Sequence, residues 1–174
     1  MGGGRDQTRD SRNDSDLWRV PTDGGAPTPF LEAVWSEGQG DISPDGRWVV
    51  FHDDELGHNE VFIRSYPTPG PKIAVSNGLG GGPEGSPDGT EITYGLGDSI
   101  GAASWEPETQ TVSDRRPLTH KTTESGRITW HEPATGGRLL VVLEPVPDEE
   151  EATDPPEARV ITNWFEELKR LVGN

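Results

Sequence analysis

The densest group of residues that could do chemistry lies between positions 52 and 59. It brings together two imidazoles, three carboxylates and an amide: His52, Asp53, Asp54, Glu55, His58 and Asn59. Imidazoles and carboxylates are the ligands of zinc sites and the usual general acids and bases of enzymes. However, the four histidines form no HExxH motif, and no two have i, i+4 spacing. We interpret the segment as a solvated acidic hairpin tip and a candidate contact loop, with no metal and no cofactor.

One other pattern resembles a nucleotide-binding motif but lacks its structural context, and the usual catalytic motifs are absent. Residues 80–85 read GxGxxG, but a Ser-Pro-Asp-Gly turn and a predicted strand follow, where a dinucleotide site needs the start of a helix. The chain has no cysteine, which excludes thiolate catalysis and disulfides. It also has no GxSxG nucleophile elbow and none of the VAIK, HRD or DFG motifs of protein kinases. We therefore predict that this chain is not an enzyme.

The charge of the chain limits its partners. The formal net charge is −16 over 174 residues. Such a surface repels nucleic-acid backbones and anionic lipid, so we expect no nucleic-acid partner. No run approaches the roughly 18 apolar residues of a membrane helix, and the first 16 residues lack the apolar core of a signal peptide. We expect no membrane insertion, and a cytoplasmic location by default, or a periplasmic one if the chain belongs to a longer exported protein.

Short runs of strand-like composition alternate with Gly/Pro turn clusters from residue 16 onward. The predicted strands are 17–21, 48–52, 61–66, 72–75, 91–94, 128–131, 139–143 and 159–162. Residues 1–15 hold no apolar residue after Met1 and are predicted to form a disordered tail. Residues 144–157 carry seven acidic residues and no basic one, which predicts a solvated loop. An N-cap at Asn163 and an apolar stripe with helical spacing predict a helix over 163–172.

A turn followed by a strand recurs along the chain. Residues 43–51 (SPDGRWVVF) return as 86–94 (SPDGTEITY) after 43 positions, and a weaker copy without the Asp follows at 133–142. A turn-plus-strand unit at this period is typical of a four-stranded propeller blade. The turn residues are Ser43, Pro44, Asp45, Gly46, Ser86, Pro87, Asp88 and Gly89. The third turn lies at 133–137.

Four stretches resemble a known family. They are 16–18 (DLW) with Pro21, 37–39 (EGQ) leading into the first turn, 59–64 (NEVFIR) and 163–171 (NWFEELKRL). On these residues the chain resembles the TolB-type, WD-repeat-like β-propellers, closest to the C-terminal propeller of bacterial eukaryotic-like serine/threonine kinases. The chain departs from the family at Gly85, where an aromatic residue is usual. Its roughly three repeats are also fewer than the four to eight blades that close a propeller.

This resemblance and the repeat together predict an all-β fold. We expect a partial β-propeller of about three four-stranded blades over 16–172 with a short C-terminal helix. The aromatic residues expected to pack between blades are Trp48, Phe51, Phe62, Tyr66 and Tyr94, with Trp18, Trp35, Trp105 and Trp130 in the same role.

The resemblance implies a protein-interaction or sensor scaffold, the C-terminal part of a larger propeller protein, that binds a protein partner or completes its propeller by self-association. Two alternatives stay open at this point. The chain could be the substrate-gating propeller portion of a prolyl-oligopeptidase-type hydrolase, or an orphan fragment without a function of its own.

Overall fold

The computed structural model describes residues 15–123 and 126–145. The predicted helix at 163–172, the predicted strand at 159–162, residues 146–157 of the acidic loop and residues 1–14 of the predicted tail lie outside the described residues. Ser15, the last residue of that tail, belongs to the folded part, because its hydroxyl donates to the carbonyl of Glu37 at 2.7 Å. Within the described residues all regular structure is β, as predicted.

Thirteen strands form four antiparallel sheets. They are β1 (Leu17–Arg19), β2 (Thr28–Leu31), β3 (Glu37–Ile42), β4 (Trp48–Asp53), β5 (Glu60–Ser65), β6 (Ile73–Ala74), β7 (Gly81–Gly85), β8 (Glu91–Leu96), β9 (Ser99–Glu106), β10 (Thr111–His120), β11 (Thr122–Thr123), β12 (Gly126–Ala134) and β13 (Arg138–Glu144). The orders are β1-β2, β3-β4-β5-β6, β7-β8-β9-β10 and β11-β12-β13. We call the second and third of these sheets the first blade and the second blade. The partial propeller predicted from the sequence is thus present.

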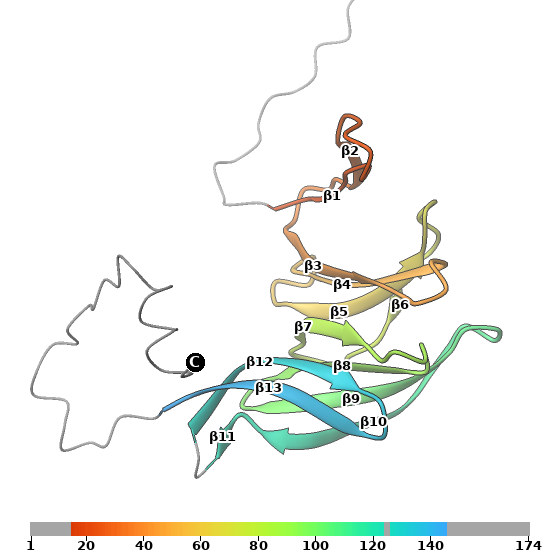
Figure 1. Cartoon of the computed structure of the whole chain (residues 1–174). Helices are drawn as coiled ribbons and strands as arrows, with labels where there is room; N and C mark the ends of the chain where they lie inside the picture. The colour runs from red at the N-terminus through yellow and green to blue at the C-terminus, as the bar shows by residue number, and fades with distance from the viewer. Residues whose placement is uncertain (1–14, 124–125, 146–174) are drawn as a thin grey trace, which may run out of the picture.

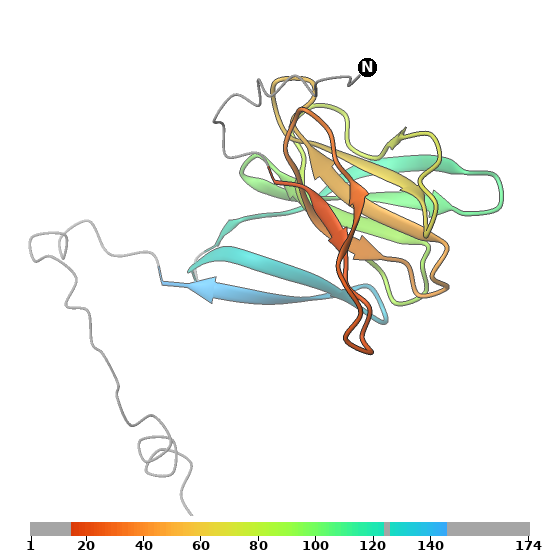
Figure 2. The ribbon, with the colours of Figure 1, turned by 90° about the horizontal axis from the view of Figure 1, so that it is seen from above.

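The sheets stack face to face, from β1 and β2 at one end to β12 and β13 at the other (Figure 1). Strand β7 contacts β3 on one side and β12 on the other, so these three are the inner strands of successive sheets. Figure 2 shows the same stack from above. At the outer side, Arg115 of β10 donates to the carbonyls of Val75 (2.7 Å) and Ala74 (3.0 Å), which fastens the second blade to the first.

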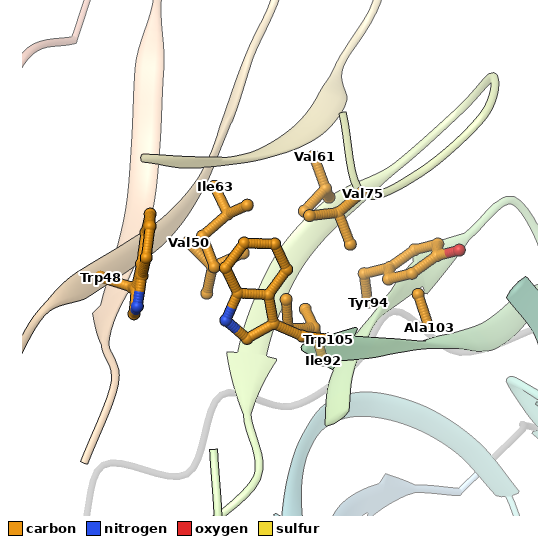
Figure 3. Packing of buried hydrophobic residues seen from close by; sticks show 9 residues of the cluster. All are labelled: Trp48, Val50, Val61, Ile63, Val75, Ile92, Tyr94, Ala103 and Trp105. Carbon is orange, nitrogen blue, oxygen red and sulfur yellow. The ribbon is translucent and has the colours of Figure 1, made fainter. Parts of the chain in front are cut away.

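Two layers of apolar side chains hold the stack together. The larger lies between the two blades and is centred on Trp48 and Trp105, whose rings meet edge to face at 5.1 Å (Figure 3). The smaller lies between the β1-β2 sheet and the first blade and contains Phe30, Phe51 and Phe62. Burial of such rings between sheets contributes about 1.5–3 kcal/mol for each side chain.

The aromatic residues predicted to pack between blades fall into a buried group and an exposed group. The buried residues are Trp48, Phe51, Phe62, Tyr94 and Trp105. Tyr66 follows β5 and is half-buried. For Trp18 and Trp130 the expectation of burial is corrected, since they are 52% and 40% exposed. Both belong to the two end sheets of the stack, which have a neighbouring sheet on one side only within the described residues.

Both Ser-Pro-Asp-Gly turns fold in the same way. The Ser43 hydroxyl donates to Asp45 Oδ1 at 2.6 Å and accepts the backbone N–H of Trp48 at 3.0 Å. The hydroxyl of Ser86 makes the equivalent bonds to Asp88 at 2.6 Å and from Glu91 at 2.9 Å. The glycines that end the turns have φ values of 68° and 72°, in the left-handed region where a side chain is strained. Each turn joins the inner strand of its blade to the second strand.

Candidate functional site

A cavity of about 420 Å³ is lined by residues of the inner strands β3, β7 and β12. Its walls mix polar side chains with one large exposed ring. The polar members are Gln39, His52, Asn59, Glu84, Lys121, Thr129 and His131. The ring is that of Trp130, and the glycine-rich segment 80–82 also lines the cavity. Its volume lies in the range of sites for small molecules or for a few side chains of a peptide.

Bulges at matching positions shape this cavity. The pairing of β3 with β4 shifts register between Gly38 and Asp41, and the pairing of β7 with β8 shifts between Gly81 and Glu84, 43 positions later. The central residues of the two bulges, Gln39 and Gly82, have φ values of 46° and 57°. A bulge bends its strand and re-aims side chains. The shift in β12, between Ile128 and Trp130, adds a third bulge on the same side.

The glycines at the bulges allow His52 to approach the backbone. A Cβ on Gly38 would lie 3.0 Å from His52 Nε2, closer than most real contacts. The N–H of Gly82 points at His52 Nδ1 at 3.5 Å. Burial lowers the pKa of His52, against the opposing effect of Asp53 and Asp54. A neutral imidazole that accepts at Nδ1 fits this environment.

Three carboxylates occupy the inner strands below the bulges. They are Asp41 of β3, Glu84 of β7 and Glu132 of β12. Asp41 accepts the N–H of Gly85 at 2.8 Å, which is a hydrogen bond between the two blades, and a Cβ added to Gly85 would lie 3.3 Å from Asp41 Oδ2. Burial, with smaller contributions from Asp41 and Glu132, raises the pKa of Glu84. Glu84 lines the cavity, whereas Asp41 and Glu132 lie outside its wall.

The opposite wall carries a buried imidazole and an ammonium group. His131 is 8% exposed, and its Nε2 has no hydrogen-bond partner among the described residues. Burial lowers the pKa of His131, and Lys121 lowers it further. Lys121 is half-buried where β10 passes into β11 and also lines the cavity. Beside them, the exposed ring of Trp130 offers a flat apolar surface.

The structure separates the six residues of the predicted contact loop. His52 and Asn59 line the cavity, whereas Asp54, Glu55 and His58 lie in the β4–β5 loop away from it. Asp53 is 1% exposed and pairs with Lys72 Nζ at 2.8 Å. The expectation of a fully solvated turn is therefore corrected at Asp53, because its carboxylate is buried against a lysine.

Lys72 joins this loop to the face of the first blade. Its ammonium group pairs with both Asp53 and Glu55 and lies 4.1 Å from the ring centre of Phe62. Glu37, directly opposite Asp53 across β3 and β4, is 3% exposed. Burial, with Asp16 and Asp53 adding to it, raises the pKa of Glu37 to about 7. These groups form a buried charged cluster, and sequence reasoning missed Glu37 and Lys72 as members of it.

Other kinds of site find no support in the described part of the chain. Residues 15–123 and 126–145 contain no group of three or more metal-ligating side chains placed to hold an ion. In the same residues no helix has the length and hydropathy of a membrane span. The GxGxxG sequence at 80–85 lies mostly in strand β7, which a tight turn and strand β8 follow, so it does not open a helix.

Known proteins resemble this chain in structure. It matches a protein assigned as TolB from Agrobacterium tumefaciens with a TM-score of 0.51 and 15% identity, over 76% of this chain and 51% of that one. The fold is a partial TolB-like β-propeller. TolB from Acinetobacter baumannii matches with a TM-score of 0.47 and 15% identity, over 76% of this chain and 44% of that one. A luciferin-regenerating enzyme matches with a TM-score of 0.45 and 16% identity, over 69% and 44%.

At these identities the likeness to TolB shows the fold alone. The chain spans about half the length of the solved structures that it matches. No protein-family model matches the chain, and no curated protein matches it. The link to serine/threonine kinases stays a prediction, as does the absence of catalysis.

Proposed function

We propose that the chain is a non-catalytic protein-interaction module that holds an extended segment of a partner protein in the cavity beside the bulges of β3, β7 and β12. The observation that carries this proposal is the repeated bulge. Three strands that are far apart in the sequence bend at matching positions and so build one polar cavity. Bulges at matching positions are features that a fold retains for a purpose, because each one interrupts a ladder of hydrogen bonds.

The cavity wall favours a peptide that carries both an apolar and a basic side chain. Trp130 is exposed beside the cavity, and exposed tryptophans are among the commonest anchors of protein interfaces. Glu84 supplies a half-buried carboxylate to the same cavity, and a lysine or arginine side chain beside it would lower its raised pKa and pair with it. The net charge of −16 attracts a basic segment from a distance.

A peptide selection on the 174-residue protein tests the proposal. Peptides from a random displayed library would be selected on the immobilised chain, and the affinity of the best one measured by fluorescence anisotropy. We expect selected peptides to combine an aromatic or aliphatic residue with Lys or Arg. Trp130→Ala should weaken binding at least tenfold, since an anchor of this kind contributes about 2 kcal/mol or more. Glu84→Gln should weaken it less and remove part of its salt dependence.

The control is Leu56→Ala, which removes an exposed apolar side chain of the β4–β5 loop, outside the cavity. Its affinity for the selected peptide should stay within twofold of the wild-type value. Equal losses for Trp130→Ala and Leu56→Ala, or selected peptides that ignore Trp130 and Glu84, would place the interaction elsewhere and overturn the proposal.

A further inference from the structure

Two strands at opposite ends of the stack each have an unused edge. In both complete blades the second strand pairs with the third, as β4 does with β5 and β8 with β9. Strand β13 pairs only with β12, and strand β1 pairs only with β2, among the described residues. An unpaired edge presents free N–H and C=O groups, which bind readily to another strand.

The two incomplete sheets hold complementary halves of one blade. Strand β12 lies beside the inner strand β7, and a short turn joins it to β13, so these are a first and a second strand. Strand β2 leads directly into the inner strand β3, as β6 leads into β7, so β1 and β2 are a third and a fourth strand. The order β12-β13-β1-β2 would therefore supply the third and fourth strands that the complete blades have, with the two-residue strand β11 at the other edge of β12.

The side chains at these ends are those that a completed blade would bury. Leu140 and Val142 are 60% and 47% exposed, on the face of β13 that points away from the second blade. Trp18 is 52% exposed, and 44 residues later Phe62, at the equivalent place in β5, is only 7% exposed. Large exposed apolar side chains grouped on a sheet face are typical of an interaction surface.

A groove marks the place of the missing strands. A cavity of about 360 Å³ lies between the second blade and β13, and Leu118, Leu139 and Arg116 contribute to its wall. Leu118 of β10 is 39% exposed there. A third and a fourth strand added to β13 would pass over this groove. Trp18 of such a pair would point into it, because Trp18 lies on the outer face of β1.

We propose that a second copy of this chain places its β1-β2 sheet against β13, so that the two half-sheets form one complete blade. Applied twice by two-fold symmetry, the contact gives a closed ring. Each copy supplies two whole blades and two halves, so the pair has six blades, within the four to eight that close a propeller.

A single copy does not make this contact by itself. The β1-β2 sheet and the β12-β13 strands lie at opposite ends of the stack, with both complete blades between them (Figure 1). Three blades are also fewer than a closed ring needs. The two half-sheets of one copy are therefore too far apart to pair with each other.

The register of the contact follows from the first blade. There Val50 pairs with Ile63 and His52 pairs with Val61. The equivalent pairs are Leu140 with Arg19 of the second copy and Val142 with Leu17 of the second copy. Opposite residues of antiparallel strands have Cα atoms about 4.5–5.5 Å apart, which is a distance that a disulfide spans.

Disulfide trapping on the full 174-residue chain tests this register. The chain has no cysteine, so the double variant Leu140→Cys, Arg19→Cys has no competing thiol. Under mild oxidation it should run as a covalent dimer on a non-reducing gel. The control Leu140→Cys, Val34→Cys places the second thiol on a loop residue that is 84% exposed and outside the contact, and it should stay mostly monomeric.

Sedimentation measurements complete the test. The wild-type chain should have twice its mass of 18.9 kDa, and Leu140→Glu should reduce it to a monomer with an unchanged circular dichroism spectrum, because Leu140 is already exposed in one copy. Leu56→Glu, in the β4–β5 loop, should remain a dimer. A wild-type monomer, a dimer without the disulfide, or a monomer whose own residues 146–174 protect β13 from hydrogen exchange would each overturn the proposal.

Discussion

The two complete blades share one turn and differ in what they bury. Their Ser-Pro-Asp-Gly turns make the same hydrogen bonds, within 0.1 Å of one another in the two bonds of each serine hydroxyl. At position 37 the first blade buries a carboxylate. At position 80, which is 43 residues later, the second blade has a glycine whose added Cβ would collide with the hydroxyl of Ser76.

This difference shows that the turn of the repeat is determined by its own residues, whereas the faces of the strands are determined by packing against adjacent sheets. The turn needs only its own four residues and the two strands that it joins, so it survives unchanged. The faces of a blade must fit the sheets on either side, and those sheets differ. The first blade lies between the aromatic layer of β2 and the second blade. The second blade lies between the first blade and β12, and its strand β9 carries the small buried side chains Ala102 and Ala103.

The largest effect should come from the layer that both blades share. Trp48→Ala and Trp105→Ala should each lower the free energy of unfolding by about 3–5 kcal/mol, because each removes a buried indole between the blades. The double variant should cost about 0.5–1.5 kcal/mol less than the sum, since the two rings contact each other. Urea unfolding followed by near-ultraviolet circular dichroism measures all three values.

The conservative variant Trp48→Phe serves as the control for this prediction. The indole N–H of Trp48 is buried and has no partner among the described residues, so removing it should cost much less than removing the ring. A loss confined to one blade, seen as two separate unfolding transitions, would contradict the idea that the layer couples them.

A smaller effect should be a pH dependence of the free energy of unfolding that comes from Glu37 in the first blade. The pKa of Glu37 is raised from 4.5 to about 7, chiefly by burial, so the folded state holds a proton that the unfolded state releases between these values. The contribution of this group is therefore favourable below pH 4.5 and is lost as the pH rises towards 7 and above. Glu37→Gln should raise the free energy of unfolding at pH 8 by at most about 3 kcal/mol.

The amide of that variant still accepts a hydrogen bond from the backbone, so it replaces the protonated carboxyl in shape. The matched control is Glu32→Gln, which exchanges an exposed carboxylate and should leave stability unchanged. The measurement is the pH dependence of the urea midpoint. A wild-type midpoint that rises steadily from pH 5 to pH 8, with no difference in Glu37→Gln, would show that this carboxylate is ionised and well solvated.

The sequence predicts the turns and the apolar strands, which depend on adjacent residues, and misses the strands whose composition depends on packing against other strands. The turns at 43–46 and 86–89 and the strands rich in aromatic and β-branched residues were predictable, because turn geometry and burial leave a mark on a few adjacent residues. Strands β3 and β7 were not predicted, since Glu37–Ile42 and Gly81–Gly85 are rich in glycine. Their glycines reflect the close approach of His52 and of the neighbouring blade.

Strand β9 was missed for a related reason. Its sequence, SIGAASWE, has small residues where a buried strand usually has large ones, and a Cβ added to Gly101 would lie 3.0 Å from the ring of Tyr94 on β8. The cavity was missed because its residues come from three separate strands. One signal could have found it. Gln39 and Gly82 hold equivalent positions in the 43-residue repeat, and both lie next to residues that interrupt a strand pattern.

The smallest effect should come from removing the serine hydroxyl of either turn. It should be the same in both blades, because the two turns have matching geometry. Ser43→Ala and Ser86→Ala each remove a hydroxyl that donates to one aspartate and accepts the backbone N–H five residues on. The Ser86 hydroxyl also accepts a longer bond, at 3.2 Å, from the N–H of Thr90. Each should lower the free energy of unfolding by about 1 kcal/mol, with the two values within 0.5 kcal/mol of each other. The threonine variants keep the hydroxyl and should lose less.

The aspartates provide a second, independent readout of the turns. The hydroxyl of Ser43 is the largest cause that lowers the pKa of Asp45 to about 2, and the hydroxyl of Ser86 likewise lowers the pKa of Asp88. Ser43→Ala should therefore raise the pKa of Asp45 towards its ordinary value and leave Asp88 unchanged, and Ser86→Ala should do the reverse. Carboxyl carbon NMR titration measures both. If either variant shifted both aspartates, the turns would be coupled through the blades and could not be the independent local units that their matching geometry implies.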